Sequence, residues 1–262
     1  MNRVVAIVVA VAFGVAAPGA LAGGGLPAAG GATASGAAAD PVRPVEATGP
    51  LADERLSDER TITRWAHAEA TAAIRAHPQG SARAIARLRT LTEDGEPEVY
   101  LALRAYRDDA GRTWVKVRIP SRPNGRRGWV PRAALGPLHR VSTRLVVSRR
   151  RLRATLYREG RAVWSSRVGI GAAGTPTPRG SFYVREILRV PTAGGPYGPW
   201  AIGTSAYSVL SDWPGGGVVG LHGTNQPELI PGRPSHGCVR LPNAAVRRLV
   251  ALMPLGTPVR VL

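Results

Sequence analysis

Short runs of β-favouring residues, each closed by a turn signal, recur along this chain from about residue 61 to the C-terminus. In Trp114–Ile119, bulky or basic side chains alternate with aliphatic ones, which is the two-residue period of a β-strand. So many short strands between residues 61 and 136 predict a small barrel. The runs of this block are Ala84–Ala86, Val99–Leu103, Trp114–Ile119 and Gly128–Val130, with turn signals at Glu93–Gly95, Asp109–Gly111 and Pro123–Gly125.

A second block, residues 142–262, continues the pattern of short strands. Arg144–Val147 and Val218–Leu221 predict strands, the latter fully buried. One amphipathic helix is predicted at Ala244–Leu252, with Asn243 placed as its N-cap. We therefore expect a mainly β fold, a small barrel followed by a β-sandwich domain with one or two short helices.

The first residues predict export. Val4–Val15 is an apolar run that follows Arg3 and is too short to span a bilayer, and the small-residue triplet Ala20–Ala22 comes after it. We interpret residues 1–22 as a signal peptide, cleaved near Ala22 or retained as an anchor; a buried N-terminal helix is the alternative. Residues 23–60, which begin with a stretch rich in Ala, Gly and Pro, are predicted to be a flexible linker. The expected location is extracytoplasmic, at the cell wall.

Charge and cysteine content narrow the function classes. The chain has 35 Lys and Arg against 17 Asp and Glu, a net charge of +18, which favours polyanionic partners. Zinc-finger spacing and basic-zipper patterns do not occur, and export argues against a nucleic-acid partner. Cell-wall polyanions or the membrane surface remain open as partners. The single cysteine excludes an internal disulfide and a thiolate-rich metal cluster, and no cofactor is predicted.

That single cysteine, Cys238, lies among residues that suit nucleophilic catalysis. His236 and Gly237 precede it directly, Arg240 follows, and His222 ends a predicted strand. A thiol needs a nearby base or cation to become a nucleophilic thiolate, and His222 and Arg240 are candidates for those roles. Gly237 lets the backbone turn tightly beside the nucleophile, so that amides of the loop can hold a developing oxyanion. The pattern indicates acyl transfer.

Two alternatives remain open at this point. In the first alternative, Cys238 is an inert buried residue, because free cysteines are usually buried. In the other, His222, His236 and Cys238 supply three ligands to zinc, although the spacing is unusual for that metal. The remaining histidines, His67, His77 and His139, are assigned to the surface or to packing.

The motifs around these residues resemble the L,D-transpeptidase family, also called the YkuD domain. The resemblance rests on His222–Asn225 and Ser235–Asn243, and extends through Gly169, Thr175–Gly180, Tyr197–Gly203 and Gly256–Val259. It covers residues 142–262 and implies a YkuD-type β-sandwich. Residues 61–136 resemble the bacterial SH3-like domains of cell-wall proteins, through Trp114–Val117, Arg122–Gly125 and Gly128–Val130. The whole arrangement resembles that of actinobacterial members.

The resemblance also implies roles for individual residues. Cys238 would be the nucleophile and His222 the general base and acid. The backbone carbonyl of Gly223 would orient the ring of His222; some members carry Ser at that position, and here only the carbonyl is available. His236 and Gly237 would form the oxyanion hole with the amide of Cys238. The residues expected to contact substrate are Arg240, Ser235, Thr224, Asn225, Tyr197 and Trp200, the last two from a lid at Arg189–Trp200.

The implied reaction is peptidoglycan cross-linking. Such enzymes acylate their cysteine with a tetrapeptide stem, release D-Ala, and pass the acyl group to the side-chain amine of diaminopimelate on a second stem. Carbapenems are implied as covalent inhibitors, and we expect a monomer. The alternatives are a carboxypeptidase or endopeptidase that hydrolyses the same acyl-enzyme, and a non-catalytic wall-binding protein.

Overall fold

The computed structural model describes residues 53–212 and 214–262, which form a mainly β fold with one short helix, as expected. The predicted signal peptide and most of the predicted linker lie outside the described residues. The described residues all belong to one compact unit. Within them, no helix is long and apolar enough to cross a membrane.

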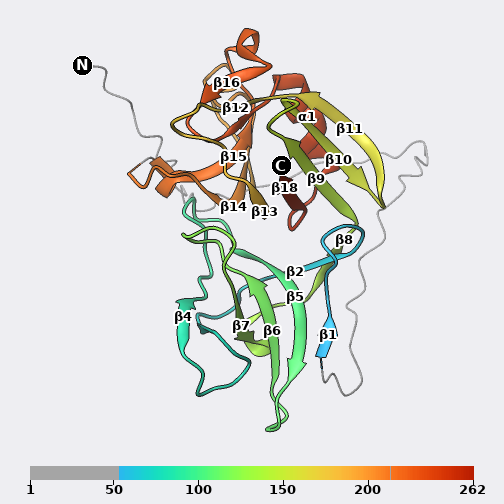
Figure 1. Cartoon of the computed structure of the whole chain (residues 1–262), viewed down its shortest axis with the longest axis vertical. Coiled ribbons are helices and arrows are strands. Elements are labelled where there is room, and N and C mark those ends of the chain that lie inside the picture. The colour runs from blue at the N-terminus through green and yellow to red at the C-terminus, as the bar shows by residue number, and fades with distance from the viewer. Residues whose placement is uncertain (1–52, 213) are drawn as a thin grey trace, which may run out of the picture. The chain divides into compact units, whose positions relative to one another are not determined.

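The first sheet has eight strands, all paired antiparallel, in the order β4-β3-β7-β6-β5-β2-β8, with β1 on β5 (Figure 1). Its elements are β1 (Asp53–Arg55), β2 (Thr63–His67), β3 (Ala73–Arg75), β4 (Ala84–Arg87), β5 (Val99–Arg107), β6 (Thr113–Arg118), β7 (Arg127–Pro131), the 3-10 helix η1 (Arg132–Ala134) and β8 (His139–Val141).

This sheet extends beyond the predicted first block at both ends. β1 falls in the stretch predicted as linker, and β8 falls between the two predicted blocks and pairs with β2. The four predicted strands of this block are present as β4 to β7. Trp114 and Trp129 are buried, which agrees with a packing role. His139 stacks on Trp65 at a centroid distance of 4.4 Å, in agreement with its assignment to packing.

The second sheet has ten strands, both parallel and antiparallel, in the order β11-β10-β9-β18-β13-β14-β15-β17-β12-β16 (Figure 1). Its strands are β9 (Thr143–Ser148), β10 (Arg153–Arg158), β11 (Arg161–Arg167), β12 (Gly169–Gly171), β13 (Gly180–Arg189), β14 (Trp200–Tyr207), β15 (Val218–His222), β16 (Gly232–Ser235), β17 (Val239–Arg240) and β18 (Pro258–Val261). The helices of this part are η2 (Pro214–Gly217), η3 (Pro227–Leu229) and α1 (Asn243–Leu252).

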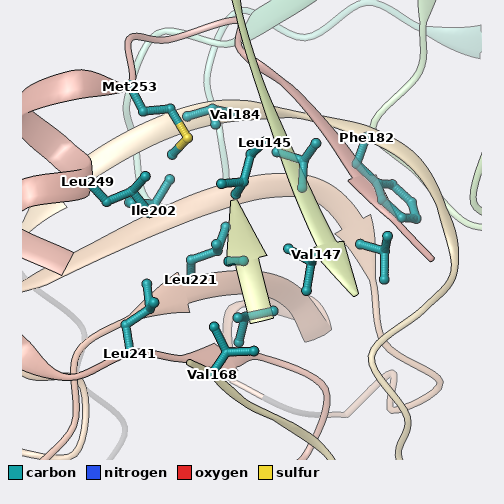
Figure 2. Close-up of a cluster of buried hydrophobic side chains, with 14 of the residues drawn as sticks. Leu145, Val147, Val168, Phe182, Val184, Ile202, Leu221, Leu241, Leu249 and Met253 are labelled. Atoms are coloured by element: carbon teal, nitrogen blue, oxygen red, sulfur yellow. The ribbon is translucent and has the colours of Figure 1, made fainter. Parts of the chain in front are cut away.

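The second sheet surrounds a core of aliphatic side chains that α1 completes. Leu145, Val168, Ile202 and Leu221 lie in it together with Leu249 of the helix (Figure 2). Such buried aliphatic groups each stabilise the fold by about 1.5–3 kcal/mol. The core holds β15 and β17 rigidly side by side, and these two strands carry the candidate site.

The helix begins one residue earlier than predicted, and the predicted cap was wrong. Its N-cap is Pro242, which makes no side-chain capping hydrogen bond. The side chain of Asn243 points elsewhere, because its Oδ1 accepts a hydrogen bond from the backbone N–H of Thr224 at 2.9 Å.

Candidate active site

The parallel pairing of β15 with β17 brings the predicted site residues onto one face of the sheet. Leu221 pairs with Val239, and His222 pairs with Arg240. Successive side chains of a strand point to opposite faces. Leu221 and Val239 are in the core, so His222 and Arg240 project together on the other face. Cys238, directly before β17, follows the same alternation and lies on that face as well.

Cys238 is half-buried, and its sulfur faces the backbone of β15. The N–H of Gly220 donates a weak hydrogen bond to Sγ over 3.5 Å. Burial raises the pKa of the Cys238 thiol, and the Gly220 N–H and the charge of Arg240 only partly offset that effect. Arg240 therefore acts in the predicted direction, but it does not produce a thiolate in the resting protein. Burial is the larger effect, so the net shift of the thiol pKa is upward.

His222 is buried, and one nitrogen of its ring is engaged. Nδ1 lies 2.6 Å from the carbonyl oxygen of Gly223, so Nδ1 carries the proton and donates. The other nitrogen, Nε2, is then an acceptor. Burial lowers the pKa of His222 to about 4, the Gly223 hydrogen bond opposes that shift, and the charge of Arg240 adds to it. The ring is neutral near pH 7 and able to accept a proton, so the resting pair is thiol and imidazole.

Three hydroxyl groups fix the segment Ser235–Cys238, which we call the nucleophile loop. Ser208 Oγ donates to the carbonyl of His236 at 3.1 Å, and Thr177 Oγ1 donates to the carbonyl of Gly237 at 2.7 Å. Ser235 Oγ donates to the carbonyl of Cys238 at 2.6 Å. Every peptide carbonyl from His236 to Cys238 therefore has a side-chain donor, and the loop is held in one conformation.

Gly237 occupies a backbone conformation that other residues rarely adopt. Its φ is 131°, in the region that favours glycine. Its N–H donates to Ser235 Oγ at 3.2 Å, and this hydrogen bond competes with the predicted role of that amide in an oxyanion hole. His236 is exposed at the surface beside it. The oxyanion roles of these two residues stay predictions.

Tyr197 lies beside His222, whereas Trp200 is linked to the site through the backbone. The Tyr197 ring is 4.9 Å from the ring of His222. Burial raises the pKa of Tyr197. Cys238 adds to that shift and Arg240 opposes it, so Tyr197 lies close to both residues. Trp200 opens β14, and its carbonyl accepts a hydrogen bond from the N–H of Gly223 at 3.2 Å.

The residues after His222 divide into buried and exposed ones. Thr224 is buried and Asn225 is exposed. Arg240 Nη1 donates to Gln226 Oε1 at 3.2 Å, while Arg240 Nε is buried and has no hydrogen-bond partner among the described residues. A guanidinium with an unused buried N–H can bind a substrate carboxylate.

Sequence reasoning missed four residues that support the site. Ser208 and Thr177 lie far along the chain from the loop that they fix. Asn243 holds Thr224, and the α-carbons of Gly198 and Gly223 approach it so closely that a side chain at either position would collide with Oδ1. Gln226 contacts Arg240. The motif around Thr177 and Asn243 marked both positions, but only the structure shows what they bind.

Metal binding was the alternative use of the histidines and the cysteine. Across residues 53–212 and 214–262, no three or more His, Cys, Asp or Glu side chains gather closely enough to hold a metal ion. The zinc alternative therefore has no ligand set in this part of the chain.

Comparison with known proteins identifies a family for the second part of the chain. Residues 142–261 match the YkuD family model, described as the L,D-transpeptidase catalytic domain. The YkuD protein of Bacillus licheniformis is 33% identical over 121 residues, which is 46% of this chain and 66% of that protein. The chain thus spans just under two thirds of that relative.

Two solved structures are similar over a comparable share of this chain. A mutant L,D-transpeptidase of Enterococcus faecium is 29% identical, covers 46% of this chain and 49% of its own, and has a TM-score of 0.36. The avibactam carbamoyl enzyme of Ldtfm is 26% identical, covers 46% and 48%, and has a TM-score of 0.34. No comparison names the first sheet, so its SH3-like character stays a prediction.

Proposed function

We propose, from the YkuD L,D-transpeptidase catalytic domain that residues 142–261 form, that this protein cross-links peptidoglycan through a thioester on Cys238. The observation that carries the proposal is the shared face of β15 and β17, on which a buried imidazole with its Nδ1 bound to Gly223 accompanies the thiol. Nucleophile, base and an orienting group for the base are the parts that acyl transfer needs.

The first half of the reaction forms the acyl-enzyme. His222 Nε2 takes the thiol proton as the Cys238 sulfur attacks the carbonyl of the third stem residue. Amides of the nucleophile loop stabilise the oxyanion. The bond to the terminal D-Ala then breaks, and the imidazolium returns its proton to the leaving amine. The backbone carbonyl of Gly223 holds the ring in the tautomer that this sequence requires.

The second half transfers the acyl group. The side-chain amine of diaminopimelate on another stem attacks the thioester and gives its proton to His222 Nε2. The C–S bond breaks, and the sulfur recovers a proton from the imidazolium. Arg240, whose Nε–H has no partner among the described residues, would bind a carboxylate of the stem peptides. Ser235, Thr224, Asn225, Tyr197 and Trp200 complete the proposed substrate contacts.

We also propose the setting of this reaction. Export by the predicted signal peptide would place the enzyme at the cell wall, where its substrate is found. Carbapenems would acylate Cys238 because a strained lactam carbonyl is open to the same attack. We propose a monomer with a catalytic domain at 142–262 and an SH3-like domain ahead of it.

Intact-mass spectrometry tests the proposal. Wild-type protein should gain the mass of a tetrapeptide stem minus D-Ala, or of a carbapenem, and Cys238→Ala should gain neither. His67→Ala, a histidine of the first sheet, is the control that should keep the adduct. An adduct that persists in Cys238→Ala would refute the assignment.

Product analysis on isolated muropeptides separates the remaining alternatives. Cross-linked dimers indicate transfer to an amine, and trimmed monomers indicate hydrolysis. Binding to sacculi without any turnover, and equal in Cys238→Ala and wild type, would favour a non-catalytic wall-binding protein.

A further inference from the structure

The loop between β6 and β7 of the first sheet binds a segment of the second sheet through hydrogen bonds. We call residues 121–125 the clamp loop. The side-chain amide of Asn124 pairs with the backbone of Tyr207 in both directions. Asn124 Nδ2 donates to the Tyr207 carbonyl at 2.8 Å, and Asn124 Oδ1 accepts from the Tyr207 N–H at 2.9 Å. Such a two-way pair fixes both the position and the orientation of the strand end at Tyr207.

Arg122 of the same loop binds three backbone carbonyls at once. Its guanidinium donates to Ser208 O at 3.1 and 3.2 Å, to Leu210 O at 2.7 Å and to Gly216 O at 2.9 Å. It also lies 4.9 Å from the centroid of the Tyr207 ring. Hydrogen bonds from a charged donor are roughly twice as strong as neutral ones. Together, Arg122 and Asn124 hold residues 207–210 from the first sheet.

The held segment is the one that reaches the nucleophile loop. Ser208 is buried, and its Oγ donates to the carbonyl of His236. Its side chain also faces Gly237, where even a single added carbon would come within 3.3 Å of Ser208 Oγ. A continuous series of contacts therefore runs from the clamp loop through Ser208 to the two residues that precede Cys238.

The two sheets do not need the clamp loop to stay attached. Arg185 of β13 donates to both carboxylate oxygens of Glu98, and Tyr183 donates to the carbonyl of Val99 at 2.8 Å. These contacts and a shared apolar cluster around Trp65 already join the sheets. The contacts of Arg122 and Asn124 are separate from that attachment, and they converge on the support of the nucleophile loop.

We propose that Arg122 and Asn124 are positioning residues for Cys238, so that the first sheet is part of the active-site architecture as well as a neighbouring module. The proposal rests on the function proposed above, because it gives the clamp loop a role in the acylation of Cys238. It gives the first sheet a role in the proposed reaction.

Acylation kinetics of the full chain test this role. Arg122→Ala and Asn124→Ala should each lower the rate constant for carbapenem acylation by ~10-fold with little change in the half-saturating concentration, because a misplacement of 1 Å can cost ~10²-fold. Arg122→Lys should recover part of the loss. The matched control is Arg104→Ala, which removes an arginine of the first sheet that donates only to Asp53 and contacts neither the clamp loop nor the second sheet.

A double-mutant cycle with Ser208→Ala distinguishes positioning of Cys238 through Ser208 from a general destabilisation of the protein. If Arg122 acts through Ser208, the double variant should lose little more rate than Ser208→Ala alone. Losses that multiply, or acylation rates for Arg122→Ala equal to those for Arg104→Ala, would overturn the proposal.

Alkylation of Cys238 by iodoacetamide gives a readout that does not need the proposed reaction. The clamp variants should shift the pH profile of alkylation, and Arg104→Ala should leave it unchanged. Wild-type protein that alkylates but never forms an acyl adduct would contradict the proposed function alone. An unchanged alkylation profile in Arg122→Ala and Asn124→Ala would contradict the positioning role.

Discussion

Arg185 and Glu98 lie buried where the two sheets meet, and Cys238 and His222 lie buried or half-buried at the candidate site. The first pair is a salt bridge, in which burial raises the pKa of Glu98 and the hydrogen bonds and charge of Arg185 oppose that rise. Burial alone would lower the pKa of Arg185, but the hydrogen bonds and charges of Glu98 and Glu93 outweigh it and raise that pKa. The second pair is neutral, because burial raises the pKa of the thiol and lowers that of the imidazole.

The difference follows from the partners that each site provides. Arg185 donates to both oxygens of Glu98, and neither side chain is exposed, so the charges compensate each other at close range. His222 has only a carbonyl on Nδ1, and the nearby charge of Arg240 disfavours an imidazolium. A pair that fixes two sheets can stay charged permanently. A catalytic pair that stays neutral becomes charged only as the thiol attacks, and a neutral thiol is also less open to oxidation.

Removing His222, the proposed base of the active site, should have the largest effect of the predicted substitutions, a loss of acylation rate. His222→Ala leaves the thiol with a raised pKa and no acceptor for its proton, so the acylation rate should fall by ~10²–10⁴. Carbapenem acylation followed by mass gives the rate, with His67→Ala as the control. A loss below tenfold would mean that the thiol is activated without His222.

The pH profile of the same reaction tests the neutral resting state. The imidazole must be unprotonated to act as a base, so the acylation rate should rise with pH through about 4 and level off above it. A rise centred near 6.5, the ordinary value for histidine, would show that burial does not control this ring.

Breaking the charged pair should have the next largest effect, on stability. Arg185→Met leaves Glu98 buried without its partner and should lower the free energy of unfolding by about 3–5 kcal/mol, measured by urea denaturation. Arg89→Met removes an arginine that is 44% exposed beside the same carboxylates, and about 0–1 kcal/mol is expected.

The double variant Arg185→Met with Glu98→Leu sharpens the test, because replacing both charges by apolar groups avoids the isolated carboxylate. It should recover most of the loss. A single variant as stable as wild type would contradict the view that this pair joins the sheets as compensated charges.

The sequence was sufficient for the class of fold, and it marked candidate site residues that the structure brings together on β15 and β17. Alternation in Trp114–Ile119 and the apolar run Val218–Leu221 marked strands, and the motifs around His222 and Cys238 marked the site. β1 and β2 (Thr63–His67) escaped prediction, because each is short and is defined by pairing with β5, far along the chain. Pairing partners of that kind leave no local pattern.

The sequence could not predict the protonation state of Cys238 or the residues that hold the nucleophile loop, for a related reason. Whether Cys238 is a thiol or a thiolate depends on burial weighed against Arg240, and that balance exists only in the folded protein. Ser208 and Thr177 donate to carbonyls of a loop distant in sequence, and neither differs locally from an ordinary strand or loop hydroxyl. Asn243 shows the converse, since a good local capping signal was overridden by a tertiary hydrogen bond.

Glu186 is intermediate in character between the charged pair of Arg185 and Glu98 and the neutral pair of Cys238 and His222. Its substitution should have the smallest effect of those predicted. It is buried next to Arg185 in the chain, and Thr92 Oγ1 donates to its Oε2 at 2.6 Å. Burial raises the pKa of Glu186 to about 7, with the charge of Asp94 adding to the shift and Thr92 and Arg185 opposing it. Below its ordinary pKa the carboxyl is neutral in both the folded and the unfolded chain, and the stability linked to it is fully present. That stability is lost as pH rises through about 7, because the folded state then has to bury a carboxylate.

Glu186→Gln keeps the shape of the side chain and replaces the titratable carboxyl group with an amide that does not titrate. Wild type should therefore lose about 1–3 kcal/mol relative to this variant when the free energy of unfolding is compared at pH 5 and pH 9. Glu96→Gln, at an exposed position of the same region, should show the wild-type dependence. Parallel curves for wild type and Glu186→Gln would mean that Glu186 is already ionised at pH 5, and that it belongs with the charged cluster of Arg185 and Glu98 rather than with the neutral groups of the active site.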